Sequence, residues 1–198
     1  MIILESVQGT DGWLKDRIGL PTASKFSEIV TSKGEPSKSR EKYLYQLAAE
    51  RLSGTKEDTY KNAAMDRGIE LEAAAREKLS FIEGVEIIQV GFCKMDDGLC
   101  GCSPDGLIGE DGGCEIKNPL SHTHIKYLRE NRLPTDYFQQ VHGSMFVTKR
   151  PWWIFMSNYP GIKPLILKIY RDEKFIDKLK MELISFNQEL ESLVNELK

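Results

Sequence analysis

The stretch of residues 103–119 constrains the fold of this chain most, because it predicts a β-hairpin that carries two acids and a lysine. It runs Ser-Pro-Asp-Gly-Leu-Ile, then a glycine-rich turn, then Cys-Glu-Ile-Lys-Asn-Pro. Side chains alternate between the two faces of a strand, so Glu115 and Lys117 point one way and Ile116 points into the core. Because a glycine turn folds the second strand back on the first, we expect Asp105 to lie close to the Glu115 face.

Two carboxylates and a lysine that converge at a strand end are typical of a metal site for phosphodiester cleavage. Hard cations such as Mg²⁺ prefer carboxylate, carbonyl and water ligands. One or two such ions activate a water molecule and stabilise the leaving oxygen, and a lysine orients that water or offsets charge on the phosphate. The alternative is a surface hairpin with ordinary exposed charges, since Glu-x-Lys alone is common. The preceding Ser-Pro-Asp-Gly at hairpin distance favours the metal site.

Pro104-Asp105 followed by Glu115-Ile116-Lys117 resembles the motif of the PD-(D/E)XK nuclease superfamily. The longer string, through Pro119, resembles the phage lambda exonuclease-like, or YqaJ-like viral recombinase, family. The resemblance implies a Mg-dependent 5′-to-3′ exonuclease that acts on linear double-stranded DNA and leaves 3′ single-stranded overhangs for single-strand-annealing recombination. It also implies a ring-shaped homotrimer, a single-strand annealing protein as partner, and a phage or prophage protein in a bacterial host.

The resemblance also implies roles for the residues of this hairpin. Asp105 and Glu115 bind one or two Mg²⁺ ions, with Mn²⁺ as the substitute ion, and the carbonyl of Ile116 completes the shell. Lys117 orients the attacking water. The metal stabilises the departing 3′-oxygen.

Two predicted helices supply further site residues. The helix over residues 62–81 holds a segment that resembles R-G-x-x-x-E-x-x-A-R of the family, whose glutamate joins the metal site; here that glutamate is Glu72. The alternative is a surface ion pair between Glu72 and Arg76, which are i,i+4 neighbours. In the helix over residues 135–149, Gln140 resembles the glutamine of RecB-type nucleases that helps to hold the active site. That pattern has a tyrosine four residues later, where this chain has Ser144.

An N-terminal segment resembles the region of the family that meets a DNA 5′-phosphate. It reads W-x₃-R-x-G-x-x-T-A-S, across predicted helices at 13–19, capped by Asp11, and at 22–30. By motif, Arg17 and Ser24 are the phosphate-binding residues. Helix N-termini favour anions, which agrees with that role. The alternative is that Ser24 only caps its helix and Arg17 pairs with a neighbouring acid.

Composition limits the possible functions. The net charge of −3 gives no global support for nucleic-acid binding, so a DNA-processing function requires a local basic channel. Candidates for its lining are Lys33, Lys38, Arg40, Lys61, Lys126 and Lys149. No apolar run approaches the roughly 20 residues of a membrane span, and the N-terminus lacks the features of a signal peptide. We therefore expect a cytoplasmic protein with no membrane association.

Cysteine and histidine need a separate test for transition metals. The four cysteines are Cys93, Cys100, Cys102 and Cys114. Their spacing fits paired zinc knuckles poorly, so we interpret them as small buried hydrophobes on neighbouring strands in a reduced compartment. His122 and His124 lie beside the candidate site, but no acid or cysteine falls at matching spacing. We expect them to contact DNA phosphate or to have no role.

The order of predicted elements indicates the fold class. Further helices are expected at 41–52, 121–132 (capped by Ser121) and 173–197 (capped by Asp172), and strands at 85–94, 99–108, 114–118, 151–157 and 165–170. This order fits a single α/β domain over 1–198 with a mixed central sheet flanked by helices, the restriction-endonuclease-like core of the PD-(D/E)XK superfamily. We expect an N-terminal helical region over residues 1–84 to pack on an α/β core over residues 85–198.

Three other functions stay open at this point. One is a different PD-(D/E)XK enzyme, either an endonuclease or a repair nuclease. Another is a catalytically inactive protein that binds DNA ends. The third is a small zinc or iron–sulfur protein built on the four cysteines.

Overall fold

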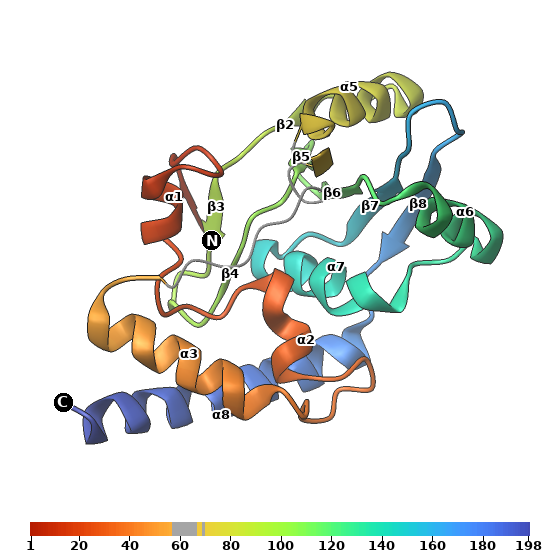
Figure 1. The fold of residues 1–198 in the computed structure, drawn as a ribbon. Coiled ribbons are helices and arrows are strands. Elements are labelled where there is room, and N and C mark those ends of the chain that lie inside the picture. Colours follow the sequence, from red (N-terminus) through yellow and green to blue (C-terminus); the bar gives the residue numbers. More distant parts are fainter. Residues whose placement is uncertain (57–66, 69) are drawn as a thin grey trace.

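Two sheets carry the strands of this computed structural model, which describes residues 1–56, 67–68 and 70–198 (Figure 1). The larger sheet orders its strands as β2 (Ile87–Ile88), β5 (Gly106–Ile108), β6 (Gly112–Lys117), β7 (Trp152–Ser157) and β8 (Leu165–Tyr170). The smaller sheet orders β1 (Ile2–Leu4), β3 (Phe92–Lys94) and β4 (Gly101–Cys102). Strands β6 and β7 run parallel and the other pairs are antiparallel. The predicted mixed sheet is therefore confirmed.

The strands predicted at 85–94 and 99–108 are wrong as single strands, because each divides between the two sheets. The first divides into β2 and β3, and the second into β4 and β5. At Gly91 the backbone passes so close to the N-terminal segment that a Cβ would lie 2.0 Å from the Ser6 carbonyl oxygen. Pro104 divides the other stretch, since proline has no N–H for a strand ladder. Local patterns predict an extended backbone but do not assign it to a sheet.

Helices flank the sheets in the order expected from the sequence. They are α1 (Asp11–Lys15), η1 (Ala23–Lys25), α2 (Phe26–Ile29), α3 (Arg40–Ser53), α5 (Glu72–Glu83), α6 (Ser121–Glu130), α7 (Thr135–Thr148) and α8 (Glu173–Glu196). The helix predicted at 22–30 is a 3₁₀ turn followed by one short α-helix. Within the helix predicted at 62–81, residues 62–66 and 69 lie outside the described residues, as does Lys61.

The predicted caps are right in one of three places. Asp172 caps α8, since its Oδ1 accepts from the Phe175 N–H at 3.0 Å. Asp11 and Ser121 are instead the first residues of their helices. The cap of α1 is Thr10, whose side chain accepts from the Trp13 N–H at 3.4 Å, and Leu120 precedes α6 with no side-chain bond.

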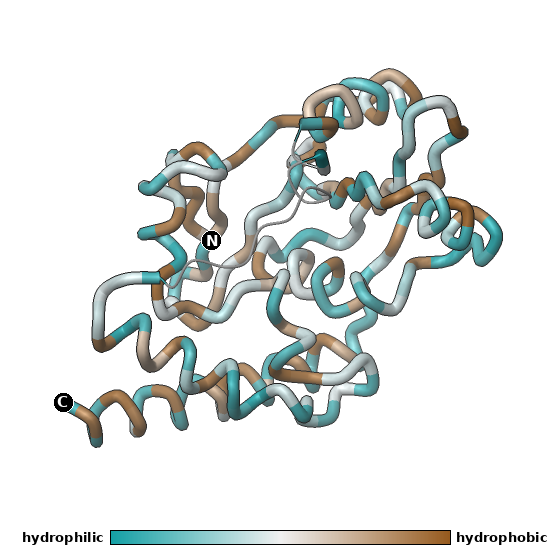
Figure 2. Tube along the Cα trace, viewed as in Figure 1, coloured by the Kyte–Doolittle hydropathy of each residue, from teal (hydrophilic) through white to brown (hydrophobic). Residues whose placement is uncertain are grey.

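The apolar residues of α8 form a stripe along one side of the helix, and this stripe packs against the core. In Figure 1, α3 lies along α8, and in Figure 2 apolar residues recur on successive turns of α8. Its buried residues are Phe175, Ile176, Leu179, Leu183, Phe186, Leu190 and Val194. The buried stripe ends at Val194, whereas Leu197 is 58% exposed.

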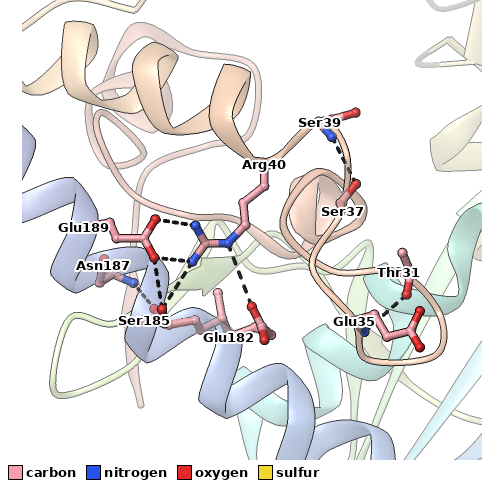
Figure 3. A network of polar contacts seen from close by, with 10 residues as sticks. Thr31, Glu35, Ser37, Ser39, Arg40, Glu182, Ser185, Asn187 and Glu189 are labelled. Atoms are coloured by element: carbon pink, nitrogen blue, oxygen red, sulfur yellow. Dashed lines mark hydrogen bonds and ion pairs between the residues drawn. The ribbon is translucent and has the colours of Figure 1, made fainter.

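A polar network joins the start of α3 to α8 (Figure 3). The Arg40 guanidinium donates to both carboxylate oxygens of Glu189, at 2.5 and 3.0 Å, and its Nε lies 3.8 Å from Glu182. Its centre is 5.2 Å from the Phe186 ring centroid. These contacts give Arg40 a structural role in joining two helices.

Across the described ranges, none of the helices combines the length and apolar character that a membrane crossing requires.

Candidate active site

The β5–β6 hairpin forms with the predicted glycine turn. Its register pairs Gly106 with Cys114 and Ile108 with Gly112. Arg150 holds the turn, because one of its nitrogens donates to the carbonyls of Ile108, Gly109 and Gly112 at 3.2, 2.9 and 2.5 Å. A Cβ at Gly112 would lie 2.0 Å from the ring of Trp152 on the neighbouring strand. The turn is thus fixed from both sides, which sets the position of the acids at the other end of the hairpin.

Asp105 lies beside β6, as the hairpin geometry predicts. It directly precedes β5, and its Oδ2 accepts from the backbone N–H of Ile116 at 2.5 Å. This bond follows the last ladder pair, Gly106 with Cys114, so the carboxylate takes the place of a further strand residue. Asp105 is 9% exposed and Glu115 is 1% exposed. Both acids are therefore largely removed from water.

Glu115 meets Lys117 and Gln140 on one face of β6. Its Oε1 accepts from Lys117 Nζ at 2.5 Å and from Gln140 Nε2 at 2.6 Å. The Lys117 ammonium also lies 5.3 Å from the centroid of the Tyr137 ring. Ile116 points to the opposite face, where it packs in a buried cluster with Leu79 of α5. The alternation expected from the sequence is confirmed.

Glu72 forms the ion pair with Arg76 and also lies within electrostatic reach of the two buried acids. Its Oε1 is 2.5 Å from an Arg76 nitrogen, and Arg76 Nε donates to the backbone carbonyl of Asp105 at 2.8 Å. Negative charge on Glu72 contributes to raised pKa values of Asp105 and Glu115. The ion pair and a place near the site are therefore compatible, since Arg76 connects the two.

The electrostatics of this site favour a cation. Burial, and then the charge of Glu115, raise the pKa of Asp105 well above its usual range, with Lys117 opposing the shift. Burial also raises the pKa of Glu115, against the attraction of Lys117. Burial alone would lower the pKa of Lys117, but the neighbouring Glu115 and Asp105 raise it, so the lysine stays protonated. One ammonium thus faces more than one buried carboxylate.

The donor atoms present fit a hard divalent cation. Within the described ranges, Glu115 Oε2 is buried and has no hydrogen-bond partner. The described ranges contain no group of three or more His, Cys, Asp or Glu side chains that could hold a metal ion by themselves. A site here would therefore need a backbone carbonyl and water in addition to carboxylates, which is the oxygen-rich set that Mg²⁺ favours.

Arg17 lies close to the hairpin, and it is bound to Ser103 rather than to a neighbouring acid. Its terminal nitrogen and Trp13 Nε1 each donate to Ser103 Oγ at 2.9 Å, two residues before Asp105. The guanidinium lies 4.1 Å from the Trp13 ring centroid, and its buried Nε has no hydrogen-bond partner among the described residues. Ser24 is exposed on η1, with its Oγ 3.4 Å from Thr22 Oγ1. Trp13 was not predicted, although its spacing of four residues from Arg17 could have indicated stacking on a helix.

Sequence reasoning missed Asn158, which joins three regions of the site from just beyond β7. Its backbone N–H donates to the Lys117 carbonyl at 2.8 Å, and its Nδ2 donates to Asn118 Oδ1 at 3.1 Å. Its Oδ1 accepts from Lys78 Nζ of α5 at 3.0 Å. Asn158 is 6% exposed. It therefore connects the strand that carries Lys117 to the helix that carries Glu72.

Asn158→Ala is expected to lower kcat of the reaction at this site about 10- to 100-fold, because small displacements of catalytic groups have effects of this size. KM for the substrate should change little, since the side chain is buried against protein atoms. Asn158→Asp keeps the acceptor for Lys78, so its kcat should lie between those of the wild type and Asn158→Ala. Steady-state kinetics measure this, with the exposed Asn195→Ala as control. A rise in KM of this size in Asn158→Ala, with kcat unchanged, would contradict a positioning role for Asn158.

The cysteines and histidines are placed as structural residues, except His122. All four cysteines are free and buried, on or beside β3 and β4 of the smaller sheet and on β6 of the larger one. This confirms their interpretation as buried hydrophobes. His124 is buried, with Nδ1 2.7 Å from Ser157 Oγ and Nε2 3.0 Å from the Lys163 carbonyl. His122 is exposed on α6.

Known proteins resemble this chain in sequence and in fold. A model of the YqaJ-like viral recombinase domain matches residues 12–151. The crystal structure of an alkaline exonuclease (LHK-Exo) from Laribacter hongkongensis is 33% identical with a TM-score of 0.87, over 95% of this chain and 96% of that one. The structure of LHK-Exo in complex with dAMP matches with the same identity and TM-score, over 96% of each chain.

A more distant structure shares the fold alone. The phage related exonuclease from Haemophilus somnus 129PT is 14% identical with a TM-score of 0.75, over 90% of this chain and 96% of that one. A search of curated protein sequences finds no match.

Proposed function

The chain belongs to the YqaJ-like viral recombinase family and is an exonuclease that hydrolyses DNA phosphodiester bonds, and from this premise we propose its substrate, direction and site. It degrades linear double-stranded DNA from the 5′ ends in a Mg-dependent reaction. The product carries 3′ single-stranded overhangs, which serve single-strand-annealing recombination. The observation that carries the proposal is the cluster of Asp105, Glu115 and Lys117, in which one buried carboxylate oxygen has no partner among the described residues.

Each residue of the cluster has a separate role in this proposal. Asp105, Glu115, the Ile116 carbonyl and Glu72 would hold one or two Mg²⁺ ions, which supply Lewis-acid activation of a water and neutralise charge on the leaving 3′-oxygen. Lys117 orients the water and offsets charge on the phosphate. Gln140 acts as a positioning residue, since its amide fixes the carboxylate of Glu115 at 2.6 Å.

Arg17 and Ser24 bind the 5′-phosphate of the strand being degraded. The Arg17 guanidinium, whose buried Nε has no hydrogen-bond partner in the described part of the chain, offers charge-assisted hydrogen bonds to such an anion. The LHK-Exo relative has been crystallised in complex with dAMP, a deoxynucleoside monophosphate. The bond from Arg17 to Ser103 supports this proposal, because Ser103 lies two residues before Asp105 in the sequence.

The same proposal covers the assembly and its setting. The chain forms a single nuclease domain over 1–198, in which the helical region over residues 1–84 packs on the core over residues 85–198. Three copies form a ring around DNA in the bacterial cytoplasm, and a single-strand annealing protein takes up the overhang. Light scattering of the purified protein tests the trimer.

Digestion of matched DNA forms tests the function directly. We expect release of mononucleotides from a linear duplex in Mg²⁺, none after chelation by EDTA, and no cleavage of the same DNA as a closed circle. Cleavage of the circle at the rate of the linear form would indicate an endonuclease. Binding of DNA ends without turnover in Mg²⁺ or Mn²⁺ would indicate an inactive end-binding protein.

Arg17→Gln is expected to reduce the preference for a 5′-phosphate about 10- to 100-fold, since hydrogen bonds to charged groups contribute about 1.5–3 kcal/mol. The measured quantity is the ratio of initial rates on 5′-phosphorylated and 5′-hydroxyl duplexes. Arg132→Gln is the control, because its side chain is 73% exposed just beyond the end of α6. An unchanged ratio in Arg17→Gln would remove this residue from the phosphate site.

A further inference from the structure

The outward face of α6 carries a row of basic side chains. His122, Lys126 and Arg129 are exposed at positions i, i+4 and i+7, which lie on one side of a helix. With Ile125 and Glu130 they line a surface hollow of about 440 Å³. We call His122, Ile125, Lys126 and Arg129 the α6 basic face. Nothing in the proposed chemistry at Asp105 and Glu115 uses these side chains.

The inward face of α6 fixes this helix beside the catalytic lysine. Buried His124 bonds at 2.7 Å to Ser157, which is the strand partner of Lys117 in the β6–β7 register. Buried Tyr127 packs edge-on against Tyr137 with ring centroids 6.3 Å apart, and that Tyr137 ring faces the Lys117 ammonium. Two independent contacts therefore hold α6, the helix that carries the α6 basic face, beside the strand of Lys117.

The charge of this segment is opposite to that of the whole chain. Residues 119–133 contain Lys126, Arg129 and Arg132 against one acid, Glu130, whereas the chain carries a net charge of −3. Glu130 lies 4.0 Å from Lys126 and 3.8 Å from Arg132. The surface of α6 therefore retains an excess of positive charge.

Two other basic residues that were candidates for a DNA channel have acidic partners elsewhere. Arg40 is bound to Glu189, and Lys149 lies 3.9 Å from Asp96. Lys126 differs from these two in that its helix, α6, is bonded through His124 to the strand partner of Lys117.

We propose that the α6 basic face binds the sugar–phosphate backbone of the DNA substrate close to the cleavage site. This inference rests on the proposed function and adds to it a surface that binds the DNA backbone. The row from His122 to Arg129 spans about 10 Å along the helix axis. A DNA strand advances about 3.4 Å along the duplex axis for each phosphate, so the row is long enough to contact more than one phosphate. Ile125 supplies an apolar contact for a deoxyribose between them.

The salt dependence of DNA binding tests this surface. The full-length protein, with its catalytic residues intact, is held in EDTA to prevent digestion, and its affinity for a 5′-phosphorylated duplex is measured by anisotropy across a series of KCl concentrations. For the double variant Lys126→Gln/Arg129→Gln we expect the slope of log K against log[salt] to become shallower by about 1.8 for duplex, or about 1.4 for a single strand. Measuring the slope with both DNA forms shows whether duplex or single-stranded DNA binds to the α6 basic face.

Two further variants make the test specific. Lys42→Gln/Lys180→Gln removes the same charge from exposed sites on α3 and α8, and its slope should match wild type. Glu130→Gln removes the acid from the hollow and should tighten binding. Thermal unfolding of each variant should match wild type, because all these side chains are at the surface or partly exposed.

The outcomes separate this inference from the proposed function. An unchanged slope in Lys126→Gln/Arg129→Gln on both DNA forms, or an equal decrease in the control pair, would overturn the role of α6. Digestion of linear DNA by the wild-type protein in Mg²⁺ is scored separately. Its absence would overturn the proposed function, whatever the slopes show.

Discussion

Lys117→Ala is expected to lower the rate of mononucleotide release from linear duplex DNA by about 10³-fold, the upper range for removing one electrostatic contact at a reacting centre. The ammonium lies 2.5 Å from Glu115 and close to Asp105, and their charges raise its pKa, so it is protonated at neutral pH. In the proposed mechanism, alanine removes both the donor that orients the water and the positive charge beside the phosphate. Single-turnover digestion in saturating Mg²⁺ measures the chemical step directly.

Folding must be measured in the same variant, because Glu115 is buried and loses its ion-pair partner. The thermal midpoint and DNA binding in EDTA identify a loss of structure. The matched control is Lys168→Ala on β8, an exposed lysine of the same sheet whose Nζ lies 4.0 Å from the Trp152 ring centroid. We expect the control to keep the wild-type rate. The expected residual rate is about a thousandth of the wild-type rate. A folded Lys117→Ala protein that retained more than about a tenth of the wild-type rate would remove Lys117 from the catalytic site.

Phe186→Ala is expected to lower the free energy of unfolding by about 3–5 kcal/mol, the usual range for truncating a fully buried phenylalanine. Phe186 is 0% exposed in the middle of α8. Its ring stacks on Tyr43 of α3 at 5.8 Å between centroids, and the Arg40 guanidinium covers it at 5.2 Å. Alanine would leave a cavity between α3 and α8 and would remove the aromatic surface under Arg40.

Urea denaturation, followed by far-ultraviolet circular dichroism, measures this change. For a chain of this size, 3–5 kcal/mol corresponds to a decrease in Tm of about 6–20 °C. Leu197→Ala is the control at the end of the same helix, because Leu197 is 58% exposed, and it should change stability by less than about 0.5 kcal/mol. Equal effects of the two substitutions would show that α8 does not pack on α3 as described.

The sequence by itself determined the elements whose information is local. The glycine turn, the alternation of Glu115, Ile116 and Lys117, and Asp105 after a proline together specify the hairpin and the face on which its charges lie. The apolar period of α8 and its cap at Asp172 were likewise predictable, since helix periodicity and capping depend on residues within a few positions. The family resemblance rests on the same short strings and is confirmed by the family match over 12–151.

Only the tertiary structure decided which distant residues meet. The bond from Arg17 to Ser103 spans 86 positions, and that from Lys78 to Asn158 spans 80. No local pattern relates such pairs. The division of two predicted strands between two sheets is of the same kind, because an extended segment is compatible with any neighbour that offers hydrogen bonds. Packing through His124 and Tyr127 likewise brings α6 beside the strand partner of Lys117. The sequence thus specified the chemistry of the hairpin, and the fold, through contacts distant in sequence, specified the residues that position it.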